Sequence, residues 1–90
     1  MELHKATDGT HKYVAVFADG KRVPFGAVGY QDYTQHHDKV RRARYLMRHK
    51  SRESWSNPKT AGALSRWLLW GDSTSVEANL RAFKRRFSLA

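Results

Sequence analysis

HKYVAVFADGKRVPF, residues 11–25, decides the fold, because it reads as two short strands joined by a tight turn. β-Branched and aromatic residues on both sides of Asp19-Gly20 are typical of strands. The Asp-Gly pair suits a two-residue turn in which both residues adopt positive φ. A second pair, Asp8-Gly9, predicts another turn. Residues 2–27 are therefore expected to form a two- or three-stranded antiparallel β-meander.

The position of the turn also predicts the register of this hairpin. A two-residue loop at Asp19-Gly20 would pair Ala15 with Pro24, at a non-hydrogen-bonded position of an edge strand where proline is tolerated. In this register one face carries Leu3, Val14, Val16, Val23 and Phe25, and the other carries His4, Tyr13, Phe17 and Arg22. We expect helices to cover the aliphatic face. Tyr13 and Phe17 would then be candidates for stacking on nucleic-acid bases, unless a second layer covers them.

The remainder of the chain predicts three helices, at about residues 32–50, 58–70 and 75–87. The first has an apolar face made by Tyr33, His37, Val40, Ala43 and Met47, which recur at spacings of three and four. The second would begin with Asn57 as cap and Pro58 at its first position. Since it is apolar nearly all round, we expect it at the centre of the core.

The third helix would begin with a capping box of Thr74 and Glu77 and would bury a stripe ending in Phe83 and Phe87. The predicted architecture is thus α+β, in which an N-terminal meander is followed by three helices. A chain of 90 residues is expected to form a single small domain over residues 1–90.

The composition narrows the class of protein. The formal net charge is +9, which favours polyanionic partners such as nucleic acid or acidic protein surfaces. The chain has no cysteine, which excludes disulfides and thiolate metal sites. It lacks an apolar run of the ~18 residues that a membrane span needs, and its N-terminus lacks the apolar core of a signal peptide. We therefore expect no membrane association and no secretion.

Seven of the 17 Lys and Arg residues lie between Lys39 and Arg52. Only Asp38 and Glu53 are close enough in sequence to neutralise them, so an external anion is favoured over an internal network. A second cluster follows near the C-terminus, where cations could also simply complement the negative end of a helix. The predicted nucleic-acid-binding residues are Arg41, Arg42, Arg44, Arg48, Lys50, Arg52, Lys84, Arg85 and Arg86. The alternatives are an acidic protein partner for the same face, or a basic face that is merely solvated.

An enzymatic function has one candidate motif, His36-His37-Asp38 after a β-hairpin, which faintly resembles the ββα-metal nucleases. No second metal ligand follows at short helical spacing, and no glycine-rich phosphate loop or nucleophile motif is present. We therefore expect a non-enzymatic protein without cofactor or metal, and keep a small metal-dependent nuclease as the second alternative.

Several unusual short motifs occur in order between Tyr13 and Phe87: Phe25-Gly26, Gly29-Tyr30, Asp32-Tyr33-Thr34, Arg48-His49-Lys50, Trp55, Thr60-Ala61-Gly62 and the Trp-Leu-Leu-Trp of Trp67–Trp70. In these motifs the chain resembles a family of short, basic, uncharacterised proteins of large DNA viruses of algae and protists, found also in related aquatic metagenomic sequences. The family pattern has lysine in place of His37, which weighs against a metal ligand there.

The resemblance implies a viral origin and one compact domain, and it implies no activity. Together with the charge it predicts a protein that binds nucleic acid through an arginine-rich helix, DNA rather than RNA, without sequence specificity. The alternative is a minor capsid or virion structural protein whose basic face binds an acidic viral protein. The expected location is the virion or the interior of the host cell, nucleus or cytoplasm. The oligomeric state is left open.

Overall fold

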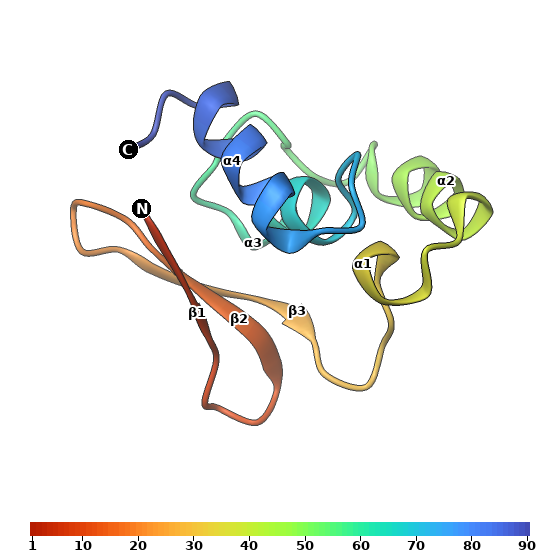
Figure 1. Cartoon of the computed structure of the whole chain (residues 1–90), viewed down its shortest axis with the longest axis horizontal. Coiled ribbons are helices and arrows are strands. Elements are labelled where there is room, and N and C mark those ends of the chain that lie inside the picture. Colours follow the sequence, from red (N-terminus) through yellow and green to blue (C-terminus); the bar gives the residue numbers. More distant parts are fainter.

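A three-stranded antiparallel sheet lies on one side of the molecule and all the helices lie on the other (Figure 1). The computed structural model describes all 90 residues. The strands β1 (Glu2–Lys5), β2 (His11–Val16) and β3 (Arg22–Ala27) follow one another in the sheet in chain order. The helical part follows the sheet in sequence, so the predicted α+β class and the N-terminal meander are confirmed.

The register of the β2–β3 hairpin differs by one residue from the prediction. Ala15 pairs with Val23, and Pro24 faces Val14 on the edge strand. The reason is a longer turn: Phe17 N donates to Lys21 O at 2.9 Å, which encloses three residues, and Gly20 takes the positive φ of 89°. Three-residue turns with glycine in the left-handed region are a common hairpin solution.

A shift of one residue exchanges the faces of β2 relative to β3. Val23 and Phe25 lie on the covered face as predicted, but the predicted faces of the β2 residues are wrong. The helices cover the face that carries Ala15, Phe17, Val23 and Phe25, all of which are buried in the main hydrophobic cluster. Phe17 is 4% exposed and cannot stack on a base. Tyr13 is half-buried and stacks on Phe25 with ring centroids 5.9 Å apart. Both residues are therefore withdrawn as base-stacking candidates.

The predicted helix over residues 32–50 is two helices, α1 (Tyr33–His36) and α2 (Lys39–His49). The break falls at His37, whose φ is 57°. Asp32 caps α1, and the side chain of Asp38 caps α2 by accepting from the backbone N–H of Val40 and Arg41. Two competing aspartate caps within seven residues thus favour two helix starts over one continuous helix.

The break also changes which side of α2 is buried. Tyr33 is no longer in phase with the apolar positions that follow, and Val40 and Met47 are 60% and 80% exposed. The side that packs inward carries Tyr45, which is buried, and Leu46, which is half-buried. Val40 and Met47 share a face of α2, but that face points to solvent, so the predicted apolar face of this helix is wrong.

The central helix begins later than predicted and changes type along its length. Thr60 caps α3 (Ala61–Leu64), so Asn57 and Pro58 lie in the preceding turn. The chain continues as the π-helix η1 (Ser65–Leu69), in which Trp70 N donates to Ser65 O at 3.0 Å. Leu64 and Leu68 are fully buried, which confirms that this segment is at the centre of the core.

The last helix, α4 (Val76–Arg86), packs on η1 and buries Phe83 in the core. Its cap is Ser75, which accepts from Ala78 N, and not the predicted box of Thr74 and Glu77. The two termini meet, since the N-terminal ammonium donates to Ala90 O at 2.8 Å. None of the helices combines the length and the apolar character that crossing a membrane would require.

Candidate functional site

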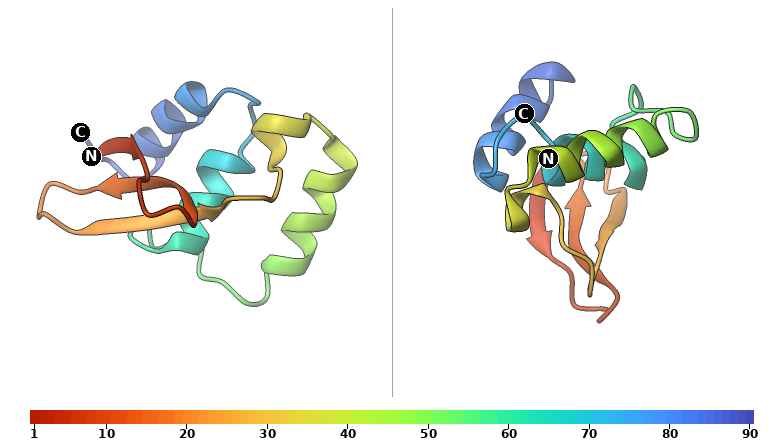
Figure 2. Two further views of the ribbon diagram at one scale, coloured as in Figure 1. Left: turned by 90° about the horizontal axis from the view of Figure 1, so that it is seen from below. Right: turned by 90° about the vertical axis from the view of Figure 1, so that its right-hand side faces the viewer.

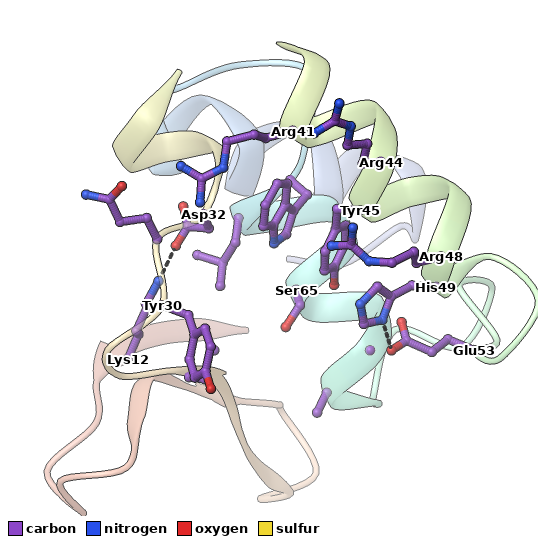
Figure 3. Close-up of a pocket in the computed structure, with 17 residues that line it drawn as sticks. Lys12, Tyr30, Asp32, Arg41, Arg44, Tyr45, Arg48, His49, Glu53 and Ser65 are labelled. Atoms are coloured by element: carbon purple, nitrogen blue, oxygen red, sulfur yellow. Dashed lines mark hydrogen bonds and ion pairs between the residues drawn. The ribbon is translucent and has the colours of Figure 1, made fainter. Parts of the chain in front are cut away.

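A cleft of about 580 Å³ opens between α2, the loop that follows β3, and the α3–η1 helix (Figure 3). Three separate parts of the chain form its walls. Helix α2 contributes a row of arginines, the sheet side contributes Lys12 and Tyr30, and η1 contributes Ser65 and Leu69. The volume of the cleft lies within the range of small-ligand sites, and its lining includes three of the arginines predicted from the sequence.

Arg41, Arg44 and Arg48 form the basic wall of the cleft. Their spacings of three and four residues place them on one face of α2. All three are exposed, and none takes part in any of the six ion pairs of the structure. Because like charges at this spacing repel one another, placing the three arginines on one face is electrostatically unfavourable.

Stacked rings lie beneath this row (Figure 3). Tyr45 is parallel to Trp70, with centroids 4.1 Å apart and an angle of 2° between the planes, and its other neighbour is His49, also at 4.1 Å. Burial, with the nearby Glu53 carboxylate, raises the pKa of the Tyr45 phenol well above its usual range. The phenol is thus neutral and able to donate a hydrogen bond.

Both carboxylates in the lining already have partners. Asp32 accepts from Lys12 Nζ at 2.7 Å, and Glu53 accepts from His49 at 2.9 Å and from Trp55 Nε1 at 3.0 Å. Neither is left to neutralise the arginine row. The lining as a whole carries a formal charge of +2 with His49 neutral, from four cations (Lys12, Arg41, Arg44, Arg48) minus two carboxylates (Asp32, Glu53).

Tyr30 lies across the cleft from the arginine row (Figure 3). It is 77% exposed and has no aromatic partner within the protein. In the sequence, Tyr30 was named only as part of the Gly29-Tyr30 motif and was not predicted as a site residue. The available signal was an aromatic residue directly after Gly29, since glycine is typical of turns. In the structure Gly29 does turn the chain, with a positive φ of 94°.

Gly26 permits the close approach of β3 to η1 at the floor of the cleft. Its φ is 79°, and a Cβ at this position would be 2.9 Å from Leu69 Cδ1 and 3.2 Å from Lys12 Cβ. A side chain there would be strained and would push apart the two walls that meet at the floor.

Arg42, predicted to contact nucleic acid, has a different role. Its Nε donates to the carbonyls of Trp70 at 3.1 Å and Gly71 at 3.0 Å, and its Nη2 donates to Asp72 at 2.9 Å. The guanidinium also lies over the ring of Tyr33. These contacts fasten α2 to the end of η1, so Arg42 is removed from the set of candidate ligand-binding residues.

Arg42→Lys is expected to lower the free energy of unfolding by about 1–2 kcal/mol, since an ammonium cannot reproduce the forked contacts. Urea unfolding followed by tryptophan fluorescence measures this change. Arg41→Lys is the matched control, because Arg41 makes no ion pair, and should change stability by less than ~0.5 kcal/mol. Equal stability of both variants would show that the Arg42 contacts do not hold α2 in place.

The other predicted basic residues lie outside the cleft. Lys50 and Arg52 follow the last residue of α2 and are exposed, because the helix ends at His49. The second cluster is at the C-terminal end of α4 beside the chain termini, on the far side of the molecule from α2 (Figure 2). The two clusters therefore do not form one continuous patch. The members of the second cluster are Lys84, Arg85 and Arg86, and the Arg86 guanidinium lies over the Trp67 ring at 3.9 Å.

The histidine motif serves the junction between α1 and α2. His36 Nδ1 accepts from Asp38 N at 2.9 Å, and its ring lies against Trp70. Burial, with Arg41 nearby, lowers the pKa of His36. His37 ends α1 and Asp38 caps α2. No three His, Asp or Glu side chains in the structure are grouped so that they could hold a metal ion.

The fold and the cleft define a small basic α+β protein with an arginine-lined cleft between its sheet and its helices. By sequence, the chain belongs to a family of unknown function, DUF5754, whose family model matches residues 1–49. This segment contains the sheet, α1 and α2, and hence Tyr30 and all three arginines of the cleft. No curated protein and no solved structure matches the chain.

Proposed function

We propose that this protein binds nucleic acid, DNA in particular, through phosphate contacts to Arg41, Arg44 and Arg48, without enzymatic activity and with little sequence specificity. One observation carries the proposal. Three exposed arginines share one face of α2, line one cleft and have no carboxylate partner.

Arginine suits this role because its planar fork binds two phosphate oxygens at once, and because it stays charged at any physiological pH. Phosphate contacts position a nucleic acid without reading its sequence. The nearby cations Lys50 and Arg52 are exposed beyond the end of the helix and would add longer-range attraction. The separate cluster at residues 84–86 is not needed for this mode of binding.

The dependence of affinity on salt tests the proposal directly. A labelled duplex and a labelled single strand of about 20 nucleotides are titrated with protein, and anisotropy is measured from about 50 to about 300 mM salt. Three phosphate contacts predict slopes of log K against log salt of about −2.7 for the duplex and about −2.1 for the single strand. Affinity without salt dependence, or no binding at the lowest salt, would contradict the proposal.

A second candidate is a minor capsid or virion structural protein whose basic face binds an acidic coat protein. The observation that favours it is the exposure of Val40 and Met47 on α2, since phosphate binding does not require apolar side chains. Protein interfaces commonly combine methionine and arginine. This candidate predicts negligible affinity for DNA at physiological salt and copurification with coat protein from virions.

A further inference from the structure

We propose that the cleft beneath α2 is a site for a single unpaired nucleotide, with its phosphate on the arginine row and its base stacked on Tyr30. The inference rests on the proposed function in using the same arginines, and it adds the chemical class of ligand that the cleft selects. It is carried by the arrangement of charge on one wall and an unpartnered aromatic ring on the other.

The size of the cleft limits which ligands can enter it. At about 580 Å³ it falls in the range of small-molecule and cofactor pockets. Such a space admits one nucleotide but not a stretch of duplex, whose paired bases are held inside the helix. A base must therefore be unpaired, in a single strand, at a strand end or in a free nucleotide, before it can enter.

The arginine row favours a ligand that carries phosphate. With a rise of 1.5 Å per residue, Arg41 and Arg44 are about 4.5 Å apart along the helix axis, and Arg44 and Arg48 about 6 Å. Two guanidinium groups can thus converge on one phosphate while the third meets a neighbouring phosphate. The paired state of Asp32 and Glu53 leaves these cations free for an anion from outside.

Tyr30 distinguishes a nucleotide from a simple phosphate or a sugar phosphate. An exposed tyrosine ring offers a stacking surface for any base, and stacking of this kind does not depend on base identity. The rings of Tyr13, Tyr33 and Tyr45 all pack against other rings of the protein, and Tyr30 does not. Its position across from the arginines separates phosphate and base by the width of the cleft (Figure 3).

The floor between these walls offers polar groups for the rest of the nucleotide. The Ser65 side chain faces the cleft, and the neutral Tyr45 phenol makes no hydrogen bond within the protein. Gln31, next to Tyr30 in the chain, also lines the cleft. Hydroxyl and amide groups can either donate or accept a hydrogen bond with a ribose or with the edge of a base. Such groups suit a site that accepts several bases.

The test compares two strands of equal charge, one of about ten thymidines and one of equal length in which every base is replaced by an abasic linker. Wild-type protein is expected to bind the thymidine strand about tenfold more tightly, since stacking of one base has roughly this effect. Tyr30→Ala should remove the preference by weakening only the thymidine strand. Tyr30→Phe should keep the preference for the thymidine strand. Val28→Ala, at an exposed position in the same loop, should also keep that preference.

Competition separates the sources of the nucleotide. Adenosine monophosphate is expected to displace the thymidine strand at lower concentration than ribose 5-phosphate or inorganic phosphate does. Displacement by all three at similar concentrations would overturn the inference, because it would show a phosphate site without base recognition. Tight binding of adenosine monophosphate by a protein that binds neither strand would support the nucleotide site and overturn the proposed nucleic-acid function.

The two proposals can fail separately. Equal affinity for the thymidine and abasic strands, with both affinities dependent on the arginine row, would overturn the inference and leave the proposed function standing. Absence of binding to both strands and to all three small phosphates would overturn both, and would favour an acidic protein as the partner of the arginine row.

Discussion

Replacing Arg44 and Arg48 together with glutamate is expected to lower the affinity for a labelled oligonucleotide at least a hundredfold at about 50 mM salt. Each charge-assisted contact to phosphate stabilises the complex by about 1.5 kcal/mol or more, and two such contacts correspond to about a hundredfold. The introduced carboxylates add repulsion. Both side chains are exposed and make no hydrogen bond or ion pair, so the free energy of unfolding should change little.

A matched control separates this site from the effect of total charge. Arg22→Glu with Arg81→Glu gives the same net charge of +5, since each pair of reversals subtracts four from +9. Arg22 is exposed on β3 and Arg81 is exposed on α4, both away from the cleft lining. We expect the control to lose less than about fivefold in affinity, because distant charges act only through the screened field. Equal losses in both double variants would show that the cationic protein attracts nucleic acid without a defined site.

The spacing of Arg41, Arg44 and Arg48 by three and four residues could be seen in the sequence, and on a helix such spacing gives a shared face. The different role of Arg42 could not be seen there. Arg42 is fixed by the carbonyls of Trp70 and Gly71, nearly thirty residues later in the chain, and no local pattern encodes such a contact. Arg52 was grouped with these arginines although the helix was expected to end at about residue 50, and the last helical residue is in fact His49.

The sheet shows how a small local error changes a functional expectation. The number and order of the strands followed from the two Asp-Gly turns and the strand composition. The faces did not, because one additional residue in the turn at residues 18–20 moved Phe17 from the predicted outer face into the core. The exposed aromatic ring of the molecule is instead Tyr30, in the loop that follows the sheet, where no periodicity indicates orientation.

Asn79 illustrates a core contact of the same non-local kind. It lies inside α4, where asparagine is an unfavourable helix residue, and it is 3% exposed. Its Nδ2 donates to Leu68 O at 3.0 Å and to Ser73 O at 2.8 Å, and its Oδ1 accepts from Ser73 N at 3.0 Å. One side chain thereby ties α4 to the end of η1 and to the turn that follows it. Arg42 holds the same end of η1 from the other side, so this junction positions α2 and its arginine row.

Asn79→Ala is expected to lower the free energy of unfolding by about 3 kcal/mol, because it removes three hydrogen bonds and leaves the buried Leu68 carbonyl without its side-chain donor. For a domain of this size, that loss corresponds to a fall in Tm of roughly 12 °C or more, measurable by thermal unfolding.

Asn57→Ala is the matched control. The side chain of Asn57, the chain's other asparagine, is exposed and accepts one hydrogen bond, from Lys59 N, so we expect a loss below ~1 kcal/mol. Asn79→Asp keeps an acceptor for Ser73 N but places a carboxylate against two carbonyls, and should be at least as destabilising as alanine. Wild-type stability of the aspartate variant would show that the two donated bonds do not hold the junction, and that α2 is positioned by Arg42 and core packing alone.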